Sequence, residues 1–133
     1  MIDFEKVQEL KQRLDTLSNQ LTERIHHEEE KLHALGLGIQ CWVKTSDQLK
    51  IGYVREKGRW QLCIRENDEY TWPMKDAPRN YKLHGARNIG LLHEALIKTA
   101  EGYIGKIEKY LMGEPDPETT AGPEDSKEGT SGA

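Results

Sequence analysis

The sequence has 133 residues, of which 35% are hydrophobic and 32% are charged, and its net charge is −4 at pH 7. That length fits one domain with an appended tail, and no apolar run is long enough to form a membrane-spanning helix. The charged N-terminus does not resemble a signal peptide, and two cysteines are too few for a disulfide framework. We therefore expect a cytoplasmic protein with reduced thiols and no membrane partner.

The first predicted element is one long helix over residues 3–35, which Asp3 caps and Gly36 ends. Its first part has apolar residues at alternating steps of three and four, the spacing of a heptad seam; they are Val7, Leu10, Leu14, Leu17 and Leu21. Glu28 interrupts the next repeat, which favours a helix packed inside a domain over a long coiled coil. Such a helix is about 50 Å long and exceeds a compact body of this size, so its overhang needs a cover.

Residues 38–66 alternate apolar and polar side chains in three runs, which predicts an antiparallel meander with one apolar face. That inner face contains Ile39, Cys41, Val43, Ile51, Tyr53, Trp60, Leu62 and Ile64. The dipeptide Lys57-Gly58 predicts a two-residue hairpin turn. This turn pairs Tyr53 with Leu62, and a three-residue loop at residues 46–48 pairs Cys41 with Tyr53.

The outer face of the predicted sheet carries Trp42 across from Gly52, with Cys63 beside them and pointing outward. The next row contains three cations, Lys44, Lys50 and Arg65. An indole that covers a strand glycine usually repairs a weak strand, and a basic row usually discourages edge pairing. The alternative is a binding surface for an anion or a nucleic acid made by Trp42, Lys44, Lys50 and Arg65, although the charge of the whole region is too small to favour nucleic acid.

After the meander, Tyr70 to Trp72 forms an optional short fourth strand that Pro73 ends. A second long helix is predicted from about Pro78 to residue 112, with its likeliest break at His84-Gly85 and a close neighbour expected at Gly102 and Gly105. Its length matches that of the first helix, so we expect the two to lie side by side and antiparallel. The acidic, Pro- and Gly-rich residues 113–133 are predicted to be a disordered tail.

Two Glu-x-x-His spacings on the first helix, Glu23 with His26 and Glu30 with His33, are the only metal-like pattern. Both lie on one polar helix face beside the apolar stripe, so we interpret them as an ordinary solvated face and predict no metal site. His93-Glu94 lacks the second histidine of a zincin motif. We find no catalytic constellation, and we predict no enzyme activity and no cofactor.

The sequence therefore predicts an α+β domain over residues 1–112: a long helix, a three-stranded meander, and a long helix antiparallel to the first. The leading functional hypothesis is a small non-enzymatic protein-interaction module. It would bind itself as a homodimer through the seam at Val7, Leu10, Leu14, Leu17 and Leu21, or bind another, unknown protein. The alternative is the anion or nucleic-acid binder described above.

Overall fold

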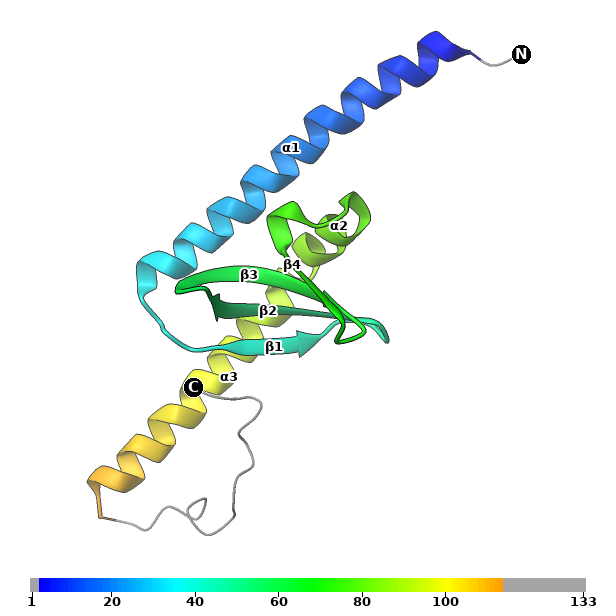
Figure 1. Ribbon diagram of the computed structural model, residues 1–133. Coiled ribbons are helices and arrows are strands. Elements are labelled where there is room, and N and C mark those ends of the chain that lie inside the picture. The colour runs from blue at the N-terminus through cyan, green and yellow to red at the C-terminus, as the bar shows by residue number, and fades with distance from the viewer. Residues whose placement is uncertain (1–2, 114–133) are drawn as a thin grey trace.

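The computed structural model describes residues 3–113 and confirms the α+β class (Figure 1). The elements in chain order are α1 (Phe4–Leu35), β1 (Cys41–Lys44), β2 (Leu49–Glu56), β3 (Arg59–Glu66), β4 (Tyr70–Pro73), the short 3-10 helix η1 (Met74–Asp76), α2 (Arg79–Arg87) and α3 (Ile89–Leu111). The strands form one antiparallel sheet in the order β1-β2-β3-β4, so the optional fourth strand exists. The predicted tail lies outside the described residues, apart from Gly113.

The predicted strand register is confirmed at each position that we derived. Lys57 and Gly58 have φ angles of 53° and 78°, the pair of positive values that a two-residue hairpin turn requires. That turn places Tyr53 opposite Leu62, and the first hairpin places Cys41 opposite Tyr53. The first strand begins at Cys41, later than the sequence pattern indicated.

Both long helices pack on the inner face of the sheet, where they enclose the core. The buried apolar residues come from all layers: Ile25 and Leu32 of α1; Ile51, Tyr53, Leu62 and Ile64 of the sheet; Met74 of η1; and Ile89, Leu92 and Leu96 of α3. The rings of Tyr53 and Trp60 stack at 5.3 Å between centroids on this face. The core therefore occupies the C-terminal part of α1 and the N-terminal part of α3 and leaves the other ends of both helices outside it.

A buried carboxylate fastens α1 to the sheet. Glu29 is only 4% exposed, and its Oε2 accepts a hydrogen bond from the backbone N–H of Leu62 at 2.7 Å. Its Oε1 accepts from Lys75 Nζ at 3.0 Å. Strand β4 ends opposite Cys63, so Leu62, which precedes Cys63 in β3, has no β4 residue opposite it. The Glu29 side chain supplies the acceptor that the N–H of Leu62 needs.

The second helical segment is interrupted at Asn88, three residues after the expected break at His84-Gly85. Asn88 lies between α2 and α3, and its Nδ2 donates to the carbonyl of His84 at 2.8 Å. Gly85 instead lies inside α2, where an added Cβ would be 2.7 Å from Met74 Sδ. Gly85 therefore allows α2 to pack closely against η1 and does not interrupt the helix.

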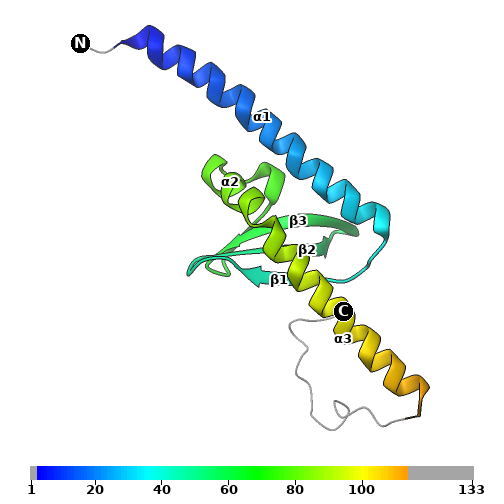
Figure 2. The ribbon, with the colours of Figure 1, turned by 180° about the vertical axis from the view of Figure 1, so that it is seen from behind.

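The expected antiparallel arrangement of the two long helices is wrong. In both views α1 and α3 run in the same general direction, and their free ends project from opposite ends of the body (Figures 1 and 2). Arg79 hydrogen-bonds to Ser18 and Lys82 to Thr22, so α2 starts beside the middle of α1 and runs the same way. An antiparallel helix over residues 78–112 would have to start beside the C-terminal end of α1. Instead, η1 leads the chain to the middle of α1, where α2 starts.

Candidate interaction surface

The predicted self-association residues of α1 lie mostly outside the body. Val7, Leu10, Leu14 and Leu17 are between 43% and 54% exposed, and Leu21 is partly buried against the core. We call these five residues the α1 seam. Antiparallel packing within one chain would have covered this part of α1 with Ala100, Tyr103, Ile107 and Tyr110. In the described residues Tyr103, Ile107 and Tyr110 do not cover it, and they are themselves at least half exposed.

The projecting half of α3 carries a second apolar row with the same spacing. Its members, which we call the α3 seam, are Ile97, Ala100, Ile104, Ile107 and Leu111. The four larger residues are between 54% and 75% exposed. The steps of three and four that define this row are present in the sequence, whereas the core buries the neighbouring row that contains Leu92 and Leu96.

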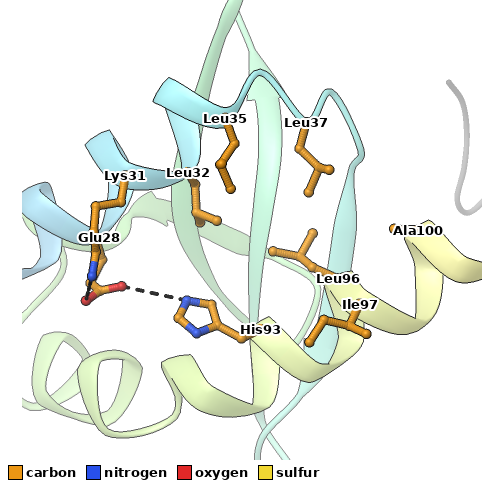
Figure 3. Close-up of a pocket in the computed structure, with 9 residues that line it drawn as sticks. All are labelled: Glu28, Lys31, Leu32, Leu35, Leu37, His93, Leu96, Ile97 and Ala100. Carbon is orange, nitrogen blue, oxygen red and sulfur yellow. Dashed lines mark ion pairs between the residues drawn. The ribbon is translucent and has the colours of Figure 1, made fainter.

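A groove lies between the C-terminal part of α1 and α3 (Figure 3). Its volume is about 470 Å³. It is lined by Glu28, Lys31, Leu32, Leu35, Leu37, His93, Leu96, Ile97 and Ala100. At its polar end His93 Nε2 lies 3.7 Å from Glu28 Oε1, and Lys31 Nζ lies 3.1 Å from Glu28 Oε2.

The groove and the seams belong to one side of the helices. Glu28 and Leu35 follow Val7, Leu14 and Leu21 at steps of seven, so they lie in the same row of α1. On α3, Ile97 and Ala100 belong both to the groove and to the α3 seam. The α3 seam therefore continues into the groove, and the α1 seam meets the groove at its polar end, where Glu28 lies between Lys31 and His93.

The outer face of the sheet is closed by its own side chains. The Trp42 indole lies directly over Gly52, where an added Cβ would be 2.6 Å from Trp42 Cε3. The guanidinium of Arg65 stacks on that indole at 4.2 Å from the ring centroid, and Arg65 Nε donates to Thr71 Oγ1 at 2.9 Å. Lys50 Nζ donates to Asp68 Oδ1 at 3.0 Å. Lys44 is exposed at the end of this row.

The expectation that Cys63 is accessible on this face is wrong, although its orientation is as predicted. Cys63 pairs with Gly52 in the register, and Gly52 pairs with Trp42, yet the thiol residue is only 1% exposed. Burial raises the pKa of Cys63 to about 12. The alternation of side chains gives the side on which a residue points, but it does not show what covers that side.

The histidine face of α1 is engaged by neighbouring charges. His26 Nδ1 lies 3.3 Å from Lys75 Nζ and 3.8 Å from Glu29 Oε1, while His26 Nε2 lies 3.8 Å from Glu30 Oε2. His33 is exposed in the last turn. Among residues 3–113, no group of three or more His, Cys, Asp or Glu side chains is arranged to hold a metal ion.

No family model, curated protein or solved structure matches this chain. In the same described range, no helix has the length and apolar character that crossing a membrane requires. The seams and the groove are therefore the surface features on which a function can be proposed.

Proposed function

We propose that this protein is a small, non-enzymatic cytoplasmic interaction module that associates with itself through the projecting parts of α1 and α3. The observation that carries the proposal is the concentration of exposed Leu, Ile, Val and Tyr side chains on these two helices, beyond the reach of the core. Exposed apolar side chains gathered on one helix face are typical of an interaction site. The two free thiols, on opposite faces of the sheet, support the cytoplasmic setting.

Helix energetics support the same proposal. Residues 4–14 of α1 extend past the last contacts that Asp15 and Ser18 make with Arg79. A helical stretch this short is only marginally stable in water by itself. Fully burying an exposed Leu, Ile or Val contributes about 1.5–3 kcal/mol, and each seam side chain gains the share that corresponds to its exposed fraction. A partner helix would therefore both order the overhang and bury its seam.

The test of this proposal is the effect of Leu14→Asp on the oligomeric state. We expect the wild-type protein to be a dimer by sedimentation equilibrium and light scattering at micromolar concentration, and Leu14→Asp to be a folded monomer. Leu14 is 45% exposed, so the charge is not buried in the single chain and the fold survives. Gln12→Asp, on the opposite side of the same helix, is the matched control and should remain dimeric. A wild-type protein that stays monomeric at high micromolar concentration contradicts the proposal.

The alternative, an anion or nucleic-acid binder, has less support. Arg65 is stacked on Trp42 and Lys50 is paired with Asp68, so most of the proposed binding groups already have partners within the chain. Titrating a labelled oligonucleotide at two salt concentrations separates the two functions. Phosphate binding weakens steeply as salt rises, whereas association through apolar helices does not.

A further inference from the structure

The charges beside the two seams are opposite in sign. The residues that flank the α1 seam include Lys6, Lys11 and Arg13. Those that flank the α3 seam include a row of three acids at steps of seven, which are Glu94, Glu101 and Glu108. In paired helices the flanking positions face each other, and they select partners by charge. Pairing α1 with a second α1 therefore sets bases against bases, and pairing α3 with a second α3 sets acids against acids.

The complementary pair, α1 with α3, cannot form along the projecting halves of one chain. These halves leave the body at opposite ends (Figures 1 and 2). We propose, building on the self-association proposed above, that two copies form a reciprocal dimer. In it the α1 seam of each copy packs on the α3 seam of the other copy.

The direction and register of this pairing follow from the structure. A two-fold axis perpendicular to the helices reverses the second copy, and α1 and α3 run the same way in one chain, so α1 meets the other α3 in antiparallel orientation. The reversed α3 seam has steps of three, four and three from Ile107 to Ile97, the same as α1 from Val7 to Leu17. Layers then form between Val7 and Ile107, Leu10 and Ile104, Leu14 and Ala100, and Leu17 and Ile97.

This register brings the flanking residues together as well. Lys11 of one copy, whose Nζ lies 2.7 Å from Asp15 Oδ2 of its own chain, then lies beside Glu101 of the other copy, so that one cation is shared by two carboxylates. On the other side of the seam, Lys6 and Arg13 lie beside Tyr110 and Tyr103, whose exposed rings are suitable for cation–π contacts. Gly102 and Gly105 fall on the outer side of α3, away from the second copy.

The groove between α1 and α3 would lie at the centre of this dimer. The α3 seam is continuous with the groove, since Ile97 and Ala100 belong to both, and the row of the α1 seam reaches the groove at Glu28 and Leu35. The two-fold axis consistent with the register passes close to the part of each chain where α1 and α3 overlap. Four helices, two from each copy, then surround this region in a four-helix arrangement, and the apolar residue Leu35 is covered there.

Charge reversal tests the proposed partner choice. We expect Lys11→Glu and Glu101→Lys each to weaken the dimer by about tenfold or more in Kd, because each dimer contains the pair twice and like charges repel. The double variant Lys11→Glu/Glu101→Lys should return close to the wild-type Kd. Lys109→Glu, on the outer side of α3, is the matched control and should leave the Kd within about twofold. Circular dichroism confirms that each variant folds.

Mixing two seam variants gives an independent readout. Leu14→Asp and Ile104→Asp should each be monomeric alone, but an equimolar mixture should form a heterodimer that keeps one intact pair of seams. The inference is overturned if Ile104→Asp alone remains a dimer, if the mixture stays monomeric, or if the double charge reversal restores nothing. In those cases a wild-type dimer still supports self-association, whereas a monomeric wild type removes both proposals.

Discussion

Removing the buried Glu29 carboxylate should destabilise the fold strongly, because it is bound both to the sheet and to Lys75. In Glu29→Ala the N–H of Leu62 loses its acceptor, which costs about 1–3 kcal/mol for a buried donor. Lys75, whose side chain is 22% exposed, also loses its counter-charge, and breaking a largely buried pair costs about 3–5 kcal/mol in total. We therefore expect a loss of about 3–4 kcal/mol in the free energy of unfolding.

Two further variants separate the parts of this effect. Glu29→Gln keeps an oxygen that accepts from Leu62 and loses only the charge, so its cost should be about 1–2 kcal/mol. Glu30→Ala removes the neighbouring exposed carboxylate and should change stability by less than about 0.5 kcal/mol. Urea unfolding followed by tryptophan fluorescence at one fixed protein concentration measures all three. If Glu29→Ala costs no more than Glu30→Ala, the hydrogen bond to β3 does not hold α1 in place and the reasoning fails.

Three more outcomes can be checked with the same protein. Trp42→Ala should make Cys63 react with a thiol reagent in the folded state, because the indole covers this side of Gly52; an unchanged rate would show that another group shields the thiol. Burial raises the pKa of Cys63 from 9.0 to about 12, so above pH 9 the unfolded chain releases a proton that the folded one keeps. The free energy of unfolding should then fall with rising pH by up to about 1.4 kcal/mol per unit, and pH titration of Cys63→Ala should show a shallower fall than the wild type. Gly102→Ala and Gly105→Ala should each stabilise α3 by up to about 1 kcal/mol in thermal unfolding, since an added Cβ meets nothing within 4 Å; a loss of dimer in either variant would place the second copy on the wrong side of α3.

The sheet was predictable because local signals and burial agree there. Lys57-Gly58 requires the positive φ angles of a two-residue turn, and any one-residue slip would move Ile64 to the outer face. The projection of α1 beyond the body was predictable from length, since a helix over residues 3–35 is longer than a compact body of this size. These features depend on period and length, which a single sequence contains.

Other features depend on contacts between distant residues and leave no local pattern. Nothing near Glu29 indicates that its carboxylate reaches a strand N–H, because a polar residue beside an apolar stripe usually faces water. Asn88 interrupts a segment whose apolar spacing continues on both sides. The close approach expected at Gly102 and Gly105 is also wrong, because an added Cβ would meet nothing within 4 Å at either residue. Among residues 3–113, an added Cβ would lie closer than 3.0 Å to a neighbour at Gly52 and Gly85.

Because Trp42 and Arg65 of the same chain cover the outer face of the sheet around Gly52, the central body does not need a second copy to cover this face. Association between copies then adds order to the ends of α1 and α3 without being needed to create the fold. The protein is expected to exist as a folded monomer below the Kd and to gain helix as it dimerises. Its helical content, measured by circular dichroism, should therefore rise with protein concentration, and the amount of assembled protein in a cell would follow its abundance.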